Sequence, residues 1–260
     1  MKNAFNFIVI ILAMAIAFSL YFFWMGNSSN FKDPATKHEP KAGNVMGTIY
    51  TGGPLVAILM GLIIVSITFI IERLLSINKA RGKANLEEFI KRIQSHLVSG
   101  DIQAAIAECD KQRGSLASIV RAGLEKYESV KNDPMIDGEK KMLEVKRAID
   151  EATNLETPLL EKNLVMLSTV ASIATMIGLL GTTLGMIRAF AALGSGGTVS
   201  AQQLSTGISE ALYNTAGGLI GAVISIVAYN YFTTKVDNFV YMIDETILSV
   251  TEILTIKIKK

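Results

Sequence analysis

Residues 189–234 form a long apolar stretch whose single charged side chain is that of Glu210. The next acidic or basic residue in the sequence is Lys235. A stretch this long and this poor in charge predicts a helix embedded in a membrane. A carboxyl group at membrane depth is energetically costly, so such a residue predicts an ion or proton site. The alternative is that Glu210 lies at the end of the helix, in interfacial water.

Small and polar residues surround Glu210 at steps of three or four, which places them on one face of a helix. They are Gly207, Asn214, Gly217, Gly221 and Ser225. Gly217 and Gly221 form a GxxxG pair, a pattern that lets membrane helices pack closely. The pattern predicts that the carboxyl group faces a neighbouring helix or a polar cavity rather than lipid.

Composition extends this prediction to the whole chain. Of its 260 residues 50% are hydrophobic and 18% are charged, which is not typical of a soluble globular protein. A membrane span needs about twenty apolar residues, and four segments fit: 4–25, 54–71, 163–187 and 204–232. The expected fold is an all-α membrane protein with about four transmembrane helices and a helical cytoplasmic domain, in which long helices extend from the membrane into the cytoplasm.

The composition also excludes several classes of site. The net charge of +2 gives no support for nucleic-acid binding. The single cysteine, Cys109, excludes a multi-cysteine metal site, and the two histidines lie too far apart in the sequence for a zinc cluster. We therefore expect no metal and no cofactor.

The first apolar segment has two interpretations, a signal peptide or a retained span. Its apolar run is longer than that of a signal peptide, and it ends in FFWMG without an A-x-A cleavage pattern. We therefore expect a retained span over residues 1–26. Residues 27–53 are expected to be a polar linker with little fixed structure of its own.

Basic residues predict the orientation of the spans. Lys79, Arg81 and Lys83 follow the second span at once, which marks the cytoplasmic side, whereas residues 194–203 contain no Lys or Arg. The expected segments are spans at 1–26, 54–75, 161–193 and 204–235, a periplasmic linker at 27–53, a periplasmic loop at 194–203, a cytoplasmic helical domain at 76–160 and a cytoplasmic C-terminal helix at 236–260.

Glu72–Lys162 contains as many acidic as basic residues, so we expect a water-facing segment. Gly100 and Asp101 predict the end of one helix and the N-cap of the next. Two apolar stripes at helical spacing predict packing faces: Met142, Val145, Ile149 and Ala152, and Val236, Phe239, Ile243, Ile247, Val250 and Leu254. The Glu and Lys pairs are typical of solvated helix faces, so we expect no enzyme active site here.

The third span carries hydroxyl side chains along one face: Ser168, Ser172, Thr175 and Thr182. The hydroxyls could bond to carbonyls of their own helix, or they could form a polar wall that lines a proton path together with Glu210. Gly181 and Gly185 form a second GxxxG pair. Arg188, at the outer end of this span, either extends to the membrane interface or pairs with an ionised Glu210.

Two motifs, GLLGTTLGMIRAFAALG at 178–194 and GISEALYNTAGGLIGAVISIVAYN at 207–230, resemble the paired motifs of the MotA/TolQ/ExbB proton channel family. The likeness is closest to ExbB and TolQ and covers most of residues 52–230. It implies a homo-oligomer, usually a pentamer, in the bacterial inner membrane. It also implies an ExbD- or TolR-like single-span partner and a TonB-like protein moved by the proton motive force.

The same resemblance implies that Glu210 is the family's acid in the last span and that Thr182 and Thr215 are its two threonines. The chain departs from the family pattern in its additional first span. It also has Thr183 where the family often has a bulky residue and Arg188 where the family often has histidine.

The resulting hypothesis is an ExbB-like subunit that energises TonB-dependent import across the outer membrane. The alternatives are a TolQ-like role in envelope maintenance, a gliding or flagellar-type stator subunit, and a non-conducting scaffold. A MotA-type stator is expected to lack an acid at the position of Glu210. A scaffold, in which Glu210 only joins helices, predicts that glutamine would serve equally well there.

Overall fold

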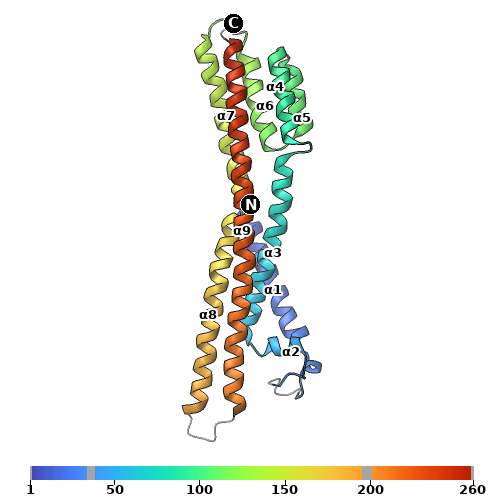
Figure 1. Cartoon of the computed structure of the whole chain (residues 1–260), viewed down its shortest axis with the longest axis vertical. Coiled ribbons are helices and arrows are strands. Elements are labelled where there is room, and N and C mark those ends of the chain that lie inside the picture. Colours follow the sequence, from blue (N-terminus) through green and yellow to red (C-terminus); the bar gives the residue numbers. More distant parts are fainter. Residues whose placement is uncertain (1, 34–38, 195–200, 259–260) are drawn as a thin grey trace. The chain divides into compact units, whose positions relative to one another are not determined.

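The computed structural model describes residues 2–33, 39–194 and 201–258, and nearly all of this chain is helical (Figure 1). The described elements are α1 (Lys2–Ser19), the π-helical η1 (Leu20–Met25), the 3-10 helix η2 (Ser28–Asn30), α2 (Val45–Tyr50), α3 (Pro54–Arg81), α4 (Leu86–Ser99), α5 (Ile102–Gln112), α6 (Ser115–Val130), α7 (Gly138–Glu161), α8 (Leu164–Gly194) and α9 (Ala201–Ile258). The described residues contain no strand, only an isolated bridge between Phe31 and Pro40.

Four helical stretches within the described residues are long and apolar enough to cross a membrane: Asn6–Met25, Pro54–Ser99, Gly138–Ala191 and Leu204–Ile258. The last three are much longer than the roughly twenty residues that a bilayer requires. The predicted all-α membrane protein with long helices is therefore confirmed. Most of the loop predicted at 194–203 lies outside the described residues.

The chain divides into two compact units. The span unit consists of Met1–Ile71 and Asn163–Asn230, and the polar unit consists of Glu72–Lys162 and Tyr231–Lys260. Helices α3 and α9 contribute residues to both units. Because α9 is continuous from Ala201 to Ile258, no break separates its apolar first part from the amphipathic part that follows.

The polar unit is built from helices whose ends the sequence predicts well. Gly100 has the left-handed φ of +88° that ends α4, and the Asp101 carboxylate accepts a hydrogen bond from the Ala104 backbone N–H at 2.9 Å, which caps α5. Both predicted apolar stripes lie inside this unit. Their side chains are buried except for Ala152 and Ile247, which are half-buried.

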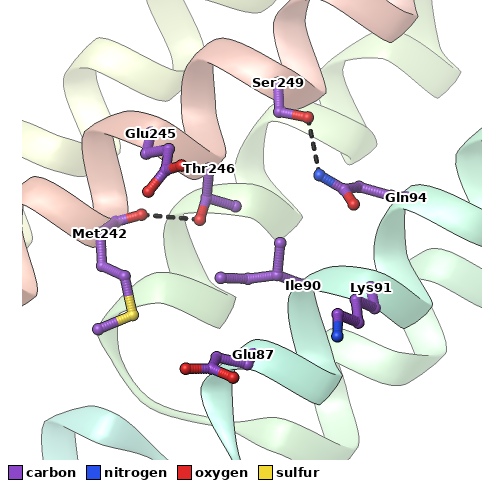
Figure 2. A pocket seen from close by; sticks show the side chains of 8 residues that line it. All are labelled: Glu87, Ile90, Lys91, Gln94, Met242, Glu245, Thr246 and Ser249. Carbon is purple, nitrogen blue, oxygen red and sulfur yellow. Dashed lines mark hydrogen bonds between the residues drawn. The ribbon is translucent and has the colours of Figure 1, made fainter.

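A groove of about 530 Å³ lies within the polar unit between α4 and the second part of α9 (Figure 2). The Gln94 amide donates to the Ser249 hydroxyl at 2.9 Å across it. Its remaining polar lining includes Glu87, Lys91 and Glu245, which carry both signs of charge. This mixture is typical of solvated helix faces, as the sequence predicted.

The linker between the first two spans is more ordered than the sequence predicted. In its described part, the Asn30 side-chain amide donates to the carbonyls of Trp24 and Met25, both at 2.9 Å. The Asn44 amide donates to the Asn30 side-chain oxygen at 3.0 Å, and the Asn44 oxygen caps α2 by accepting from the Gly47 N–H. The expectation of little fixed structure was wrong because asparagine side chains replace the missing backbone partners.

Cys109 is expected to resist thiol reagents in the folded protein. Its side chain is 2% exposed, and burial, assisted by the neighbouring Asp110 carboxylate, raises the pKa of the Cys109 thiol to about 12. A higher pKa leaves less thiolate, which is the reactive form. At pH 8 we expect iodoacetamide to modify folded protein at least about tenfold more slowly than denatured protein. Equal rates, measured by mass spectrometry, would contradict this packing.

Candidate functional site

Glu210 lies on α9 inside the span unit, and only 8% of the residue is exposed. Its carboxylate accepts a hydrogen bond from the Arg188 guanidinium on α8, and the two side chains form an ion pair. The Arg188 side chain is 57% exposed. The carboxyl group therefore faces a neighbouring helix, whereas more than half of the Arg188 side chain that pairs with it is exposed.

Glycines bring α8 and α9 into backbone contact, and the two helices lie side by side in opposite directions (Figure 1). A Cβ atom built on Gly218 would lie 2.6 Å from the Ala174 carbonyl oxygen and 2.8 Å from the Gly178 Cα. A Cβ atom on Gly185 would lie 2.8 Å from the Gly207 carbonyl oxygen. No side chain fits at these contacts, so polar groups on the two helices can meet directly.

Thr182 on α8 and Thr215 on α9 meet in this way. Their hydroxyls share a hydrogen bond. Each also bonds to its own helix, Thr182 to the Gly178 carbonyl and Thr215 to the Ala211 carbonyl, both at 3.2 Å. Because α8 and α9 run in opposite directions, the threonine pair and the Arg188–Glu210 pair form neighbouring polar layers at one helix interface.

Asn214 lies between these layers and is fully buried. Its amide nitrogen donates to the Gly52 carbonyl at 2.7 Å and to the Glu210 carbonyl at 2.9 Å. Its side-chain oxygen has no hydrogen-bond partner among the described residues. Gly181 packs on it, since a Cβ atom on Gly181 would lie 2.3 Å from the Asn214 Cβ.

Sequence reasoning missed the contact between Gly53 and Glu210. A Cβ atom at Gly53 would lie 2.5 Å from Glu210 Oε1, and Gly53 has a left-handed φ of +79°. The available signal was the Gly52-Gly53 pair directly before Pro54, which by itself marks only the start of a span. A glycine pair at a helix start does not indicate which distant side chain it contacts.

The hydroxyl face predicted on the third span is only partly brought to the site. Ser168, Ser172 and Thr175 donate to carbonyls of their own helix, those of Val165, Ser168 and Ala171, at 3.0, 3.2 and 3.1 Å. These hydrogen bonds agree with the first of the two interpretations, and the polar wall stays a prediction for these three residues. Of the predicted face, Thr182 alone has a described hydrogen bond to α9.

The remaining predicted glycines contact a second helix, α3. A Cβ atom on Gly217 would lie 3.4 Å from Leu59 Cδ1, an ordinary contact, and one on Gly221 would lie 3.3 Å from Ile63 Cγ1 and 3.4 Å from Ala174 Cβ on α8. One step further along α9, the hydroxyls of Ser225 and Ser66 share a 2.5 Å hydrogen bond. The predicted polar and small-residue face of α9, from Gly207 to Ser225, therefore contacts two helices, α8 and α3.

Comparisons with known proteins match the region that contains the site. The MotA/TolQ/ExbB proton channel family matches residues 111–245, which include Thr182, Arg188, Glu210 and Thr215. Within the described residues, no group of three or more His, Cys, Asp or Glu side chains is placed to hold a metal ion.

Individual relatives match stretches of different lengths. The Tol-Pal system protein TolQ of Pseudomonas aeruginosa is 29% identical over 154 residues, which cover 59% of this chain and 67% of the relative. TolQ of Haemophilus influenzae is 41% identical over 91 residues, 35% of this chain and 40% of the relative. The biopolymer transport protein ExbB of Aquifex aeolicus is 43% identical over 77 residues, 30% of this chain and 52% of the relative. The last two matches span about half or less of the relative's length.

Proposed function

We propose that this chain, which belongs to the MotA/TolQ/ExbB proton channel family, is the proton-conducting subunit of an ion-driven motor and that Glu210 is its proton carrier. The chain is a multi-pass inner-membrane protein. The observation that supports the proposal most directly is the buried Glu210 carboxylate, which pairs with Arg188 at a helix interface. Ionisable groups inside a membrane mark ion and proton pathways.

The pair suggests how a proton could be taken up and released. The ionised carboxylate is stabilised by Arg188, whereas a protonated carboxyl no longer needs a counter-charge and is tolerated in a low-dielectric environment. Alternation between the two states moves one proton past the interface. One charge that crosses a potential of about 100 mV releases roughly 2.3 kcal/mol, which is enough to bias a conformational change.

The threonine pair has a supporting role in this proposal. The hydroxyls of Thr182 and Thr215 do not ionise near neutral pH, but they can donate and accept hydrogen bonds. Because their layer adjoins Glu210, they can orient a water molecule or the carboxyl group between uptake and release. Arg188 is the counter-ion, and Asn214 and the glycines at 181, 185, 217 and 221 support the packing around it.

Relatives named ExbB and TolQ both match, so the system that this subunit drives is part of the proposal. We propose an ExbB-like subunit that uses the proton motive force in TonB-dependent import, assembled as a homo-oligomer with an ExbD-like single-span partner and a TonB-like protein. A TolQ-like role is the second candidate. The match to TolQ of Pseudomonas aeruginosa, which extends over 154 residues, favours the TolQ-like role.

The proposed orientation follows from charge. The basic residues after the second predicted span place residues 76–160 and 236–260 in the cytoplasm, and residues 27–53 and 194–203 in the periplasm. Glu210 lies near the start of α9 and Arg188 near the end of α8. In this orientation the ion pair is closer to the periplasmic side, from which protons enter under the proton motive force.

Proton flux tests the proposed function. The chain would be reconstituted into vesicles together with an ExbD- or TolR-like single-span protein, and the decay of an imposed pH gradient would be followed with an internal dye. We expect wild-type vesicles to lose the gradient faster than vesicles that contain Glu210→Gln. Equal decay in the two would contradict a proton-carrying role for Glu210.

Arg188→Gln tests the ion pair itself. The variant leaves a nearly buried carboxylate without its counter-charge, and we expect the protein to lose about 1 kcal/mol of stability, a modest figure because Arg188 is partly exposed. Thermal unfolding of purified protein in mild detergent measures the loss. The matched control is Arg147→Gln, which breaks the exposed Arg147–Glu151 pair and should change stability by less than about 0.5 kcal/mol. Equal effects would show that Glu210 does not depend on Arg188.

A further inference from the structure

Gly53 lies directly against the carboxyl group of Glu210. A Cβ atom at this position would be 2.5 Å from Glu210 Oε1 and 3.2 Å from its Cδ, both closer than van der Waals contact. The clash involves the end of a flexible side chain rather than backbone atoms. A side chain at position 53 would therefore displace the carboxyl group before it disturbed the helices.

The turn that contains Gly53 is held against α9 by a buried hydrogen bond. The Asn214 amide donates to the Gly52 carbonyl at 2.7 Å, and Asn214 is fully buried. A Cβ atom on Gly52 would also lie 3.1 Å from the Tyr213 Cβ, so the turn follows the surface of α9 closely. The position of Gly53 relative to Glu210 is thus set by contacts with the helix that carries Glu210.

The first span also contacts the segment that leads into this turn. The rings of Tyr21 and Tyr50 are stacked, with their centroids 4.6 Å apart and their planes at 20°. The Tyr21 hydroxyl donates to the Tyr50 carbonyl at 3.1 Å, three residues before Gly53. Tyr21 and Met25 also pack with Val56 and Ala57 at the start of α3. The additional N-terminal span therefore reaches the turn beside Glu210.

We propose that Gly53 is a positioning residue for the proton carrier: its lack of a side chain lets the Glu210 carboxylate pair with Arg188, and the first span keeps the Gly52–Gly53 turn in place. This inference rests on the proposed role of Glu210. It assigns a role to the additional span, which is a departure from the family pattern. Gly53 leaves room for the Glu210 carboxylate because it has no side chain. Tyr21 and Asn214 act indirectly, since their hydrogen bonds hold the Gly52–Gly53 turn in place.

Gly53→Ala tests the proposal, and the chain offers a matched control in Gly43→Ala. Gly43 has almost the same left-handed backbone, with a φ of +78°, but a Cβ atom at this position would meet nothing within 4 Å. Both variants introduce the same backbone strain. A difference between them can therefore be assigned to the contact with Glu210.

The measurement is the rate at which a hydrophobic carbodiimide modifies Glu210 in native membranes at pH 7, followed by mass spectrometry. The reagent reacts with carboxyl groups, and the ion pair with Arg188 competes with that reaction, so a carboxyl group displaced from Arg188 reacts faster. We expect Gly53→Ala to react about tenfold faster than wild type, which is the effect of losing one hydrogen bond to a charged group. Gly43→Ala should react at the wild-type rate. Equal rates in the two variants would overturn the positioning role.

Two further variants keep the proposal open to contradiction. If Gly53→Ala does not accumulate, combining it with Glu210→Asp should restore accumulation, because the shorter side chain leaves room for the methyl group. A double variant that still fails would overturn the proposal.

Tyr21→Phe, which removes only the hydrogen bond to Tyr50, should raise the labelling rate about threefold. An unchanged rate would show that this hydrogen bond does not hold the turn.

The labelling experiment does not require proton flux, so the two proposals can fail separately. If Glu210→Gln retains full proton-coupled work but Gly53→Ala labels faster, then the positioning geometry holds and the carrier role is wrong. If Glu210→Gln is inactive but Gly53→Ala and Gly43→Ala label alike, then the carrier role holds and Gly53 is not a positioning residue.

Discussion

Glu210→Gln is expected to insert, fold and assemble like the wild-type protein and to lose its proton-coupled work. Glutamine keeps the size of the side chain, and its amide oxygen can still accept a hydrogen bond from Arg188, but it cannot bind and release a proton. We expect a loss of at least about a hundredfold, the scale on which a positioned proton-transfer group contributes. The measurement is growth that depends on energised import, together with proton flux in vesicles.

The control for this prediction is Glu151→Gln, which makes the same chemical change in an exposed ion pair with Arg147. It should leave growth and flux unchanged. Gel filtration of each purified complex would show that the oligomer is intact. Full activity of Glu210→Gln would support the scaffold hypothesis, in which Glu210 only joins α8 and α9.

The neighbouring threonines should have smaller effects in the same assays. Thr182→Ala and Thr215→Val each remove one hydroxyl from the shared hydrogen bond, and both should weaken proton-coupled work without abolishing it. Glu210→Asp should preserve part of the work if the shorter side chain still reaches Arg188. A threonine variant as inactive as Glu210→Gln would assign the hydroxyls a larger role than orientation.

Gly218→Ala is expected to destabilise the span unit strongly. The added methyl group would lie 2.6 Å from the Ala174 carbonyl oxygen and 2.8 Å from the Gly178 Cα. Because both are backbone atoms, α8 and α9 must separate, and overpacking of this kind typically costs about 1–3 kcal/mol. The shift would also pull Thr215 from Thr182. The thermal unfolding midpoint of purified protein in mild detergent measures the loss.

Gly217→Ala is the matched control, because it adds the same methyl group one residue earlier. There the methyl would meet Leu59 Cδ1 at 3.4 Å, an ordinary contact. Alanine also favours helix over glycine by up to about 1 kcal/mol, so this variant should be neutral or slightly stabilising. Equal destabilisation by the two variants would contradict the packing of α9 between α8 and α3.

The membrane class, the long helices and the isolated acid could all be predicted from the sequence. Apolar length and the scarcity of charge are local properties of the chain, and both are visible around Glu210 without any knowledge of the fold. The caps at Gly100 and Asp101 and the stripe that begins at Val236 were predictable for the same reason. Each depends on neighbours within a few residues.

The partners of Glu210 were decided by the tertiary structure. The sequence left Arg188 with two interpretations, and it could not connect Gly53 or the Gly52 carbonyl to α9, because Asn214 and Gly52 are 162 residues apart. It also singled out Gly217, whereas the backbone contact with α8 is made by Gly218. Adjacent helical residues point about 100° apart. The rotation of each helix against its neighbours therefore decides which residue makes a contact, and that rotation is set by packing that involves the whole span unit.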